Sequence, residues 1–218
     1  MSEILSNEMK KIEVLLSSLS TIVDNNLRNA IESLKKTDVE MAKKVISDDS
    51  EIDRMEIELE EECLKILALH QPVAIDLRFI IAVLKINNDL ERIGDLSSNI
   101  CQIVLIYKNV ESFNVPNTIL DMTEVVFDML KNSLDSILYR DSNLAKKVLK
   151  SDNDVDKLHQ EMYSLVKNKI MGGSESDFDR WLPMLSVSRY LERIADHCTN
   201  IAEDVDYLIT GHISRHGQ

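Results

Sequence analysis

A repeated acidic motif is the feature that most constrains what this chain can fold into. The segment LERIGD at residues 90–95 recurs as LERIAD at residues 191–196. Upstream of each copy, the segment AKKV occurs at residues 42–45 and again at residues 145–148. Two matched blocks in the same order, at offsets of 103 and 101 residues, predict an internal duplication of about 100 residues. The fold must therefore be one that half of the chain can form twice.

The composition favours helices. Only 5 glycines and 3 prolines occur among the 218 residues, which predicts an ordered, all-helical chain. Breaks between the apolar patterns fall at the few helix-breaking segments, and at residues 36–38 and 140–142 an Asp or Ser can cap the helix that follows, Asp38 in the first and Asp141 or Ser142 in the second. The pattern predicts six helices, over residues 3–36, 39–70, 73–109, 117–140, 142–171 and 177–210.

Six helices combined with the duplication predict a specific architecture. We expect an all-α fold of two tandem antiparallel three-helix bundles, related by internal pseudo-symmetry. The first repeat would span residues 1–112 and the second residues 113–218. Apolar side chains at helical spacing, such as Val45, Ile52 and Leu59, give each helix one face to bury in its bundle.

The charge and the cysteines exclude several classes of protein. A net charge of −13 argues against nucleic-acid binding and against electrostatic docking on an anionic membrane. Three cysteines fit neither a disulfide framework nor a thiolate metal site. The sequence shows no secretory signal pattern and no run of 18 apolar residues, so we expect a cytoplasmic protein.

The third helix of each repeat carries an apolar line that turns acidic halfway along the helix. Like charges four residues apart lie on one helix face and repel each other, so an acidic pair in this place needs compensation, and a cation is the simplest one. The first line runs through Leu77, Ile81 and Leu84 to Glu91 and Asp95, and the second through Phe178, Leu182 and Leu185 to Glu192 and Asp196.

The second helix of each repeat supplies two more acids. Residues early in one helix of an antiparallel pair lie opposite residues late in the next, so two carboxylates from each helix should meet. Four close negative charges either raise some pKa values or bind metal. Glu56 and Glu60 follow along the same face of the second helix. The predicted metal ligands are Asp49, Asp53, Glu91 and Asp95 in repeat one, and Asp152, Asp156, Glu192 and Asp196 in repeat two.

Oxygen-only ligands favour Mg²⁺, Mn²⁺, Ca²⁺ or iron over a thiolate zinc site. A salt-bridged polar layer is the alternative, because Arg92 and Arg193 can pair with neighbouring acids. His197 could add a nitrogen ligand, although a histidine outside the ligand set is the more common case. The chain shows no nucleophile triad, no phosphate-binding loop and no Glu-x-x-His motif, so we do not expect an enzyme. A carboxylate-liganded metal-dependent enzyme or a metal store remains the competing class.

Three segments carry a resemblance to a known family. QPVAIDLR at residues 71–78, DLERIGD at 89–95 and RYLERIADH at 189–197 resemble the PhoU family, the phosphate-specific transport accessory proteins of bacteria and archaea. The resemblance covers roughly residues 8–208. It implies a cytoplasmic, commonly dimeric protein of two three-helix bundles. Its Glu/Asp-xxx-Asp motifs would be the eight acids above, holding divalent or multinuclear metal ions such as iron, manganese, magnesium or zinc.

The resemblance also implies a regulatory role. A member would act as a negative regulator of phosphate uptake through two partners, the phosphate ABC transporter ATPase and the phosphate-sensing histidine kinase. It would meet the membrane complex only through proteins. One departure stands out: many relatives have a histidine where this chain has Leu96, whereas repeat two has His197 and also His159. The two sites are therefore expected to differ in ligands or affinity.

Overall fold

A computed structural model describes residues 3–107, 114–171 and 175–211, and it confirms the six-helix prediction. The described residues contain no β-strand. The start of the third helix differs by one residue from the prediction and that of the sixth by two, and the predicted end at residue 109 lies outside the described residues. The helices are α1 (Glu3–Lys36), α2 (Val39–His70), α3 (Ala74–Ile106), α4 (Asn117–Tyr139), α5 (Ser142–Met171) and α6 (Glu175–Thr210).

Short local signals set the sharp turns between helices within each repeat. Oδ1 of Asp38 accepts hydrogen bonds from the backbone N–H groups of Glu40 at 3.1 Å and Met41 at 3.0 Å. Oδ1 of Asp141 accepts a hydrogen bond from the backbone N–H of Asn143 and caps α5, so of the two predicted candidates Asp141, not Ser142, is the cap. At the ends of α1, α2 and α4 the chain reverses through one residue with left-handed backbone angles, although none of the three is glycine. These turns make consecutive helices antiparallel.

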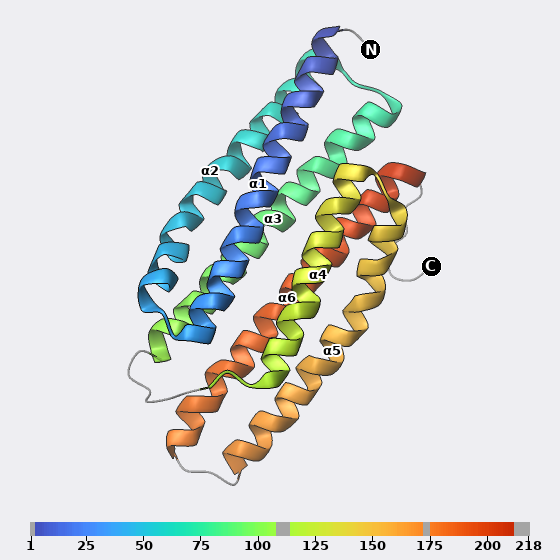
Figure 1. Ribbon diagram of the computed structural model, residues 1–218. Coiled ribbons are helices and arrows are strands. Elements are labelled where there is room, and N and C mark those ends of the chain that lie inside the picture. Colours follow the sequence, from blue (N-terminus) through green and yellow to red (C-terminus); the bar gives the residue numbers. More distant parts are fainter. Residues whose placement is uncertain (1–2, 108–113, 172–174, 212–218) are drawn as a thin grey trace.

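The two repeats share a broad interface. In each repeat the three helices pack against one another, and between the repeats α3 packs against α6 and α1 against α4. Figure 1 shows α1 and α4 in front, α3 and α6 behind them, and α2 and α5 at the sides. Helices α2, α3, α6 and α5 thus form one layer in that order, which α1 and α4 cover on one side. Because α3 and α6 run in opposite directions, the repeats are related by a pseudo-twofold axis.

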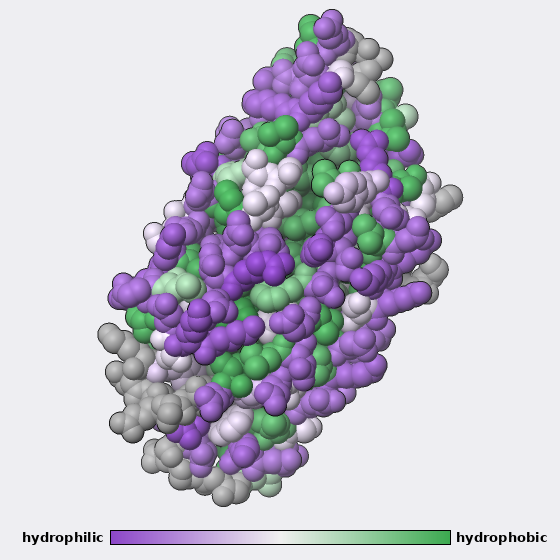
Figure 2. Space-filling view, viewed as in Figure 1, coloured by the Kyte–Doolittle hydropathy of each residue, from purple (hydrophilic) through white to green (hydrophobic). Residues whose placement is uncertain are grey.

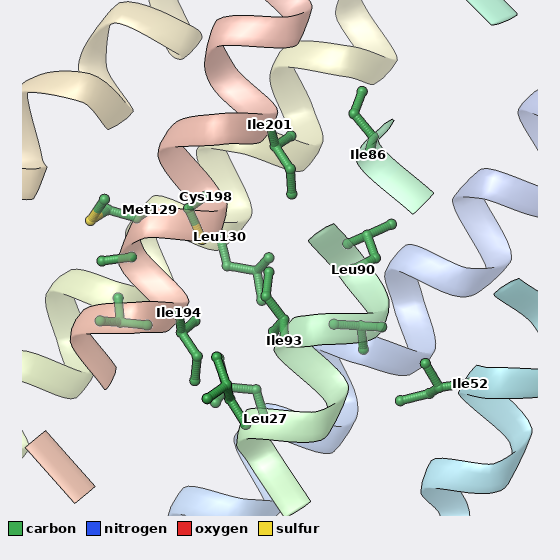
Figure 3. Packing of buried hydrophobic residues seen from close by; sticks show 14 of the residues in the cluster. Leu27, Ile52, Ile86, Leu90, Ile93, Met129, Leu130, Ile194, Cys198 and Ile201 are labelled. Carbon is green, nitrogen blue, oxygen red and sulfur yellow. The ribbon is translucent and has the colours of Figure 1, made fainter. Parts of the chain in front are cut away.

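One hydrophobic core runs through both repeats. Ile86, Leu90 and Ile93 of α3 and Ile194 and Ile201 of α6 are fully buried, and Figure 3 shows Ile93 directed toward α6 and Ile194 and Ile201 directed toward α3. Burial of apolar area contributes about 25 cal/mol per Å², so this seam is a main source of stability. The predicted boundary between residues 112 and 113 lies outside the described residues and stays a prediction. Along the described helices, no apolar stretch is long enough to cross a bilayer.

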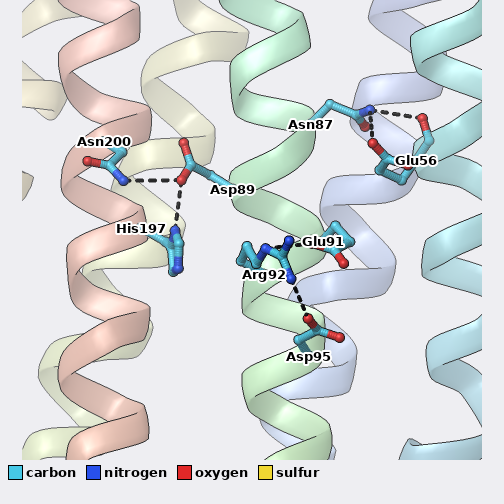
Figure 4. A network of polar contacts seen from close by, with 8 residues as sticks. All are labelled: Glu56, Asn87, Asp89, Glu91, Arg92, Asp95, His197 and Asn200. Carbon is cyan, nitrogen blue, oxygen red and sulfur yellow. Dashed lines mark hydrogen bonds and ion pairs between the residues drawn. The ribbon is translucent and has the colours of Figure 1, made fainter.

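Polar contacts fix how the repeats meet. Nδ1 of His197 lies 2.7 Å from Oδ1 of Asp89, and Nδ2 of Asn200 donates to the same oxygen at 3.2 Å (Figure 4). Lys85 and Asp204 form a second ion pair across the interface, at 2.6 Å. The duplication does not reproduce the first contact, because Tyr190 and Leu96 stand at the positions that correspond to Asp89 and His197. These unsymmetric contacts select one way of packing two similar units.

Candidate metal centres

The acids of repeat one meet between α2 and α3. Burial raises the pKa of Asp49, and the carboxylates of Asp95 and Asp53 raise it further, while the nearby Ser98 hydroxyl opposes the shift. Burial likewise raises the pKa of Glu91, with Asp95 and then Asp53 adding to the effect and the Arg92 guanidinium opposing it. Each acid therefore feels the charge of acids on the facing helix, as the antiparallel register predicts.

Among the described residues, two carboxylate oxygens of this group are buried without a hydrogen bond: Oδ1 of Asp49 and Oε2 of Glu91, of which the second is in an ion pair with Arg92. Arg92 forms its ion pairs with acids of α3, although its charge also opposes the rise in the pKa of Glu56 on α2. Its Nη1 lies 3.0 Å from Oδ2 of Asp95 and its Nε 3.3 Å from Oε2 of Glu91 (Figure 4). Among the described residues no basic side chain pairs with Asp49 or Asp53. The salt-bridged layer thus exists on one helix and is missing on the other.

Repeat two places its acids in the same way between α5 and α6. Burial raises the pKa of Asp152, and Asp156 and Asp196 add to the shift. Burial also raises the pKa of Asp196, followed by the charges of Glu192 and Asp156, while His197 and Arg193 oppose it. In the described part of the chain, none of these four acids forms an ion pair. Repulsion in repeat two is therefore even less compensated than in repeat one.

The two histidines near this second group already have partners. Nδ1 of His197 contacts Asp89, as described above, and Nδ1 of His159 lies 2.9 Å from the Ser188 hydroxyl. Asp89 itself is the residue that sequence reasoning missed. Its signal was available, because Asp89 stands between the apolar positions Ile86 and Ile93 and so had to lie in an interface.

Gly94 allows the close approach of α3 to α2 that brings the first group together. A Cβ at this position would lie 2.9 Å from Cδ1 of Ile52 and 3.3 Å from Oδ1 of Asp49. The corresponding residues of repeat two are Ala195 and Val155. Valine lacks the methyl group that meets the extra Cβ, so repeat two can carry an alanine at the position where repeat one has glycine.

Whether these residues suit a metal depends on donor chemistry and charge. All donors are carboxylates, which suit hard cations, and both groups carry unrelieved repulsion. Over the described ranges, however, no three His, Cys, Asp or Glu side chains already converge on a single ion position. Metal binding would therefore require the acids of each repeat to turn toward one another and, in repeat one, Arg92 to release Glu91 and Asp95. The residues fit a divalent cation on these terms.

A groove of about 520 Å³ lies elsewhere, between α1 and α4. Figure 2 shows it as a hollow with apolar side chains on the face that α1 and α4 form. Leu16, Phe79 and Leu134 line it, with Arg28 and Arg140 among its charged residues. No member of either acidic group lines this groove.

Known proteins share the sequence and the fold. The family model described as "PhoU domain" matches residues 16–104 and 119–205. A curated relative from Clostridium acetobutylicum, named phosphate-specific transport system accessory protein PhoU homolog, is 33% identical over 210 residues, covering 96% of this chain and 95% of the relative. A homolog of the same name from Aquifex aeolicus is 34% identical over 212 residues, covering 97% and 96%.

Solved structures agree closely with this fold. The crystal structure of PhoU from Pseudomonas aeruginosa superposes with a TM-score of 0.91 at 32% identity, covering 95% of this chain and 99% of that one. That of the phosphate transport system regulatory protein PhoU from Streptococcus pneumoniae gives a TM-score of 0.86 at 27% identity, covering 97% and 100%. With both repeats matched and the fold shared over nearly its whole length, the chain belongs to the PhoU family.

Proposed function

We propose that this protein is a regulatory accessory protein of phosphate uptake and phosphate-starvation signalling. Its relatives are named as accessory proteins of the phosphate-specific transport system, and they match nearly the full chain. The neighbour from Streptococcus pneumoniae is named a regulatory protein. The protein would act as a negative regulator through the phosphate ABC transporter ATPase and the phosphate-sensing histidine kinase.

The acidic groups would serve this role as binding sites for divalent or multinuclear metal ions: iron, manganese, magnesium or zinc. The observation that carries this part is the uncompensated repulsion between facing helices. In each repeat, burial and neighbouring acids raise carboxylate pKa values, and among the described residues no basic side chain pairs with the acids of α2 or α5 named above. A cation between the helices would relieve that repulsion and hold each pair of helices together.

A non-catalytic role is favoured over a metal-dependent enzyme. Catalytic metals need an open coordination position inside a pocket that holds a substrate. The groove between α1 and α4 has the volume for a ligand, but none of the eight acids lines it. We further infer a cytoplasmic homodimer that reaches the membrane complex only through partner proteins.

Metal binding is tested by stripping the purified protein with a chelator, reloading it with Mn²⁺ or Fe²⁺ and measuring bound metal by elemental analysis. Glu91→Ala/Asp95→Ala should remove the metal of repeat one and leave that of repeat two. The matched control, Glu40→Ala/Asp154→Ala, removes two exposed acids from other surfaces and should bind as much metal as the wild type. Unchanged metal content in the first variant would refute the site.

The regulatory role is tested in cells that lack this protein, with a phosphate-starvation reporter measured at high external phosphate. Wild-type protein should restore repression of the reporter. Tagged protein from phosphate-replete cells should co-purify with the transporter ATPase or the sensor kinase. Full repression without the protein, together with recovery of neither partner, would reject the assignment.

A further inference from the structure

Exposed apolar side chains occupy corresponding positions in the two repeats. Leu77 and Ile81 of α3 are 39% and 36% exposed, and their counterparts on α6, Phe178 and Leu182, are 46% and 41% exposed. These residues form the first half of the line that ends at Glu91 in repeat one and at Glu192 in repeat two. The protein's own helices therefore leave this part of the line partly exposed.

The neighbouring helix widens each line. The hydrogen bond from Asn87 to the backbone oxygen of Glu56 sets the register of α2 against α3 and brings Leu64, which is 51% exposed, level with Ile81. In repeat two, Tyr163 of α5 is 57% exposed and corresponds to Glu60, not to Leu64. The hydrogen bond between His159 and Ser188 brings Tyr163 level with Leu185. We call these surfaces the apolar strips: Leu64, Leu77 and Ile81 in repeat one, and Tyr163, Phe178 and Leu182 in repeat two.

The duplication makes these exposed apolar side chains informative. Single exposed apolar residues are normal on protein surfaces and need no explanation. Here two halves of quite different sequence both keep large apolar side chains at corresponding positions of α3 and α6. Both lines continue into an acidic group, in repeat two past the exposed Arg189. Because burying apolar area is favourable, a surface kept in this form twice indicates a binding face.

Charge decides which occupant fits. A second copy of this chain, laid strip to strip, would bring acids against acids, and nucleic acid or an anionic membrane would meet the same repulsion. A basic partner would not. Lysine or arginine side chains beside an apolar helix face could pair with the acids while the apolar residues cover the strip. Among the described residues Asp49 and Asp53 of α2 form no ion pair, so such contacts are available in repeat one.

We propose that each repeat docks one amphipathic, basic helical segment of a partner protein. The pseudo-twofold relation of the repeats then implies that one chain holds two such segments in antiparallel orientation. The matching partner is a symmetric dimer or two copies of one protein. This inference goes beyond the proposed function, because it needs no metal and makes no reference to phosphate.

The test uses the full chain in EDTA and a synthetic helical peptide with leucines at every third or fourth position and lysines beyond one end of that apolar face. Isothermal titration calorimetry should give two peptides per chain. Trp181 is the single tryptophan of the chain and precedes Leu182, so its fluorescence should report binding to repeat two. A peptide with glutamates in place of the lysines should bind roughly tenfold more weakly or worse.

Variants assign the two sites. Ile81→Ser and Leu182→Ser should each reduce the stoichiometry to one peptide, and the double variant should bind none. The control is Val14→Ser, which removes an apolar side chain on α1 that is 65% exposed and lies outside both strips. It should bind two peptides, and all variants should keep the wild-type circular dichroism spectrum because the replaced side chains are exposed.

Three results would overturn the proposal: stoichiometry unchanged in both single variants, equal binding of the lysine and glutamate peptides, or a concentration-dependent dimer in light scattering that the double variant abolishes. The last result would show that a second copy covers the strips. Because EDTA removes metal, peptide binding and metal loading succeed or fail separately. Failure of this inference therefore leaves the proposed metal sites untouched, and the reverse also holds.

Discussion

Gly94→Ala should destabilise the protein, although alanine is the better helix former. The added Cβ would lie 2.9 Å from Cδ1 of the fully buried Ile52. Overpacking of this kind costs about 1–3 kcal/mol, and the gain in helix propensity returns about 1 kcal/mol. We expect a net loss of about 1 kcal/mol in the free energy of unfolding. The shift of α3 should also disturb Asp49, whose Oδ1 would be 3.3 Å from the new methyl group.

Ile52→Val supplies the second arm of the experiment, because it removes the methyl group that would clash. Alone it should cost about 1 kcal/mol through the small cavity it leaves. Combined with Gly94→Ala it recreates the Val155–Ala195 pair of repeat two, in which the alanine methyl fills the space. The double variant should be about as stable as the wild type, which corresponds to a favourable coupling energy of about 2 kcal/mol.

Urea titration followed by far-ultraviolet circular dichroism measures all four corners of this cycle. Val155→Ile in repeat two gives the mirror test: it should be destabilising beside Ala195 and tolerated beside Ala195→Gly. If Gly94→Ala is as stable as the wild type, or if the losses of the two single variants simply add in the double variant, then the packing argument is wrong.

Three further predictions follow from the same structure. Asp89→Ala should lower the free energy of unfolding by about 2 kcal/mol, because it removes a charge-assisted contact across the repeats. A double-mutant cycle with His197→Leu should show coupling between the two residues, and purely additive losses would contradict the prediction. Asp152→Asn should stabilise the metal-free protein, because it removes one of the acids that repel each other in repeat two. In excess Mn²⁺ the same variant should lack the stabilisation that bound metal gives the wild type, about 2.7 kcal/mol at 100 times the dissociation constant, and calorimetry with and without chelator measures both effects. Burial raises the pKa of the Cys63 thiol to about 12, so this thiol should resist alkylation at about pH 9, which mass spectrometry measures. Because an unfolded thiol ionises near pH 8.5, the free energy of unfolding should fall as the pH rises above that value, which pH-dependent unfolding measures.

Much of the fold could be predicted because its signals are local. The 3.6-residue spacing of apolar side chains, the Asp38 and Asp141 caps and the scarcity of glycine and proline act within a few residues of the chain. They gave the six helices with the observed bounds to within a few residues. The acids of each repeat could also be placed together, because a short turn between antiparallel helices fixes which residues face each other.

Other features depend on how the helices pack in three dimensions. The orientation of Arg92 toward its own helix, and not toward α2, depends on side-chain packing that no spacing rule describes. The contact between Asp89 and His197 arises only once α3 meets α6. The exposure of Leu77 and Ile81 could not be predicted either, because a line of apolar residues at helical spacing has the same sequence pattern whether or not a neighbouring helix covers it.

The sequence by itself therefore determined the repeat, the helices and the positions of the eight acids, since helix formation and short turns are decided by neighbouring residues. Only the tertiary structure decided how the two repeats join, which of the described acids lack a basic side-chain partner and which apolar side chains stay exposed. Those outcomes depend on the packing of α3 against α6, where apolar burial and a few unsymmetric polar contacts select one arrangement among those that two similar bundles could adopt.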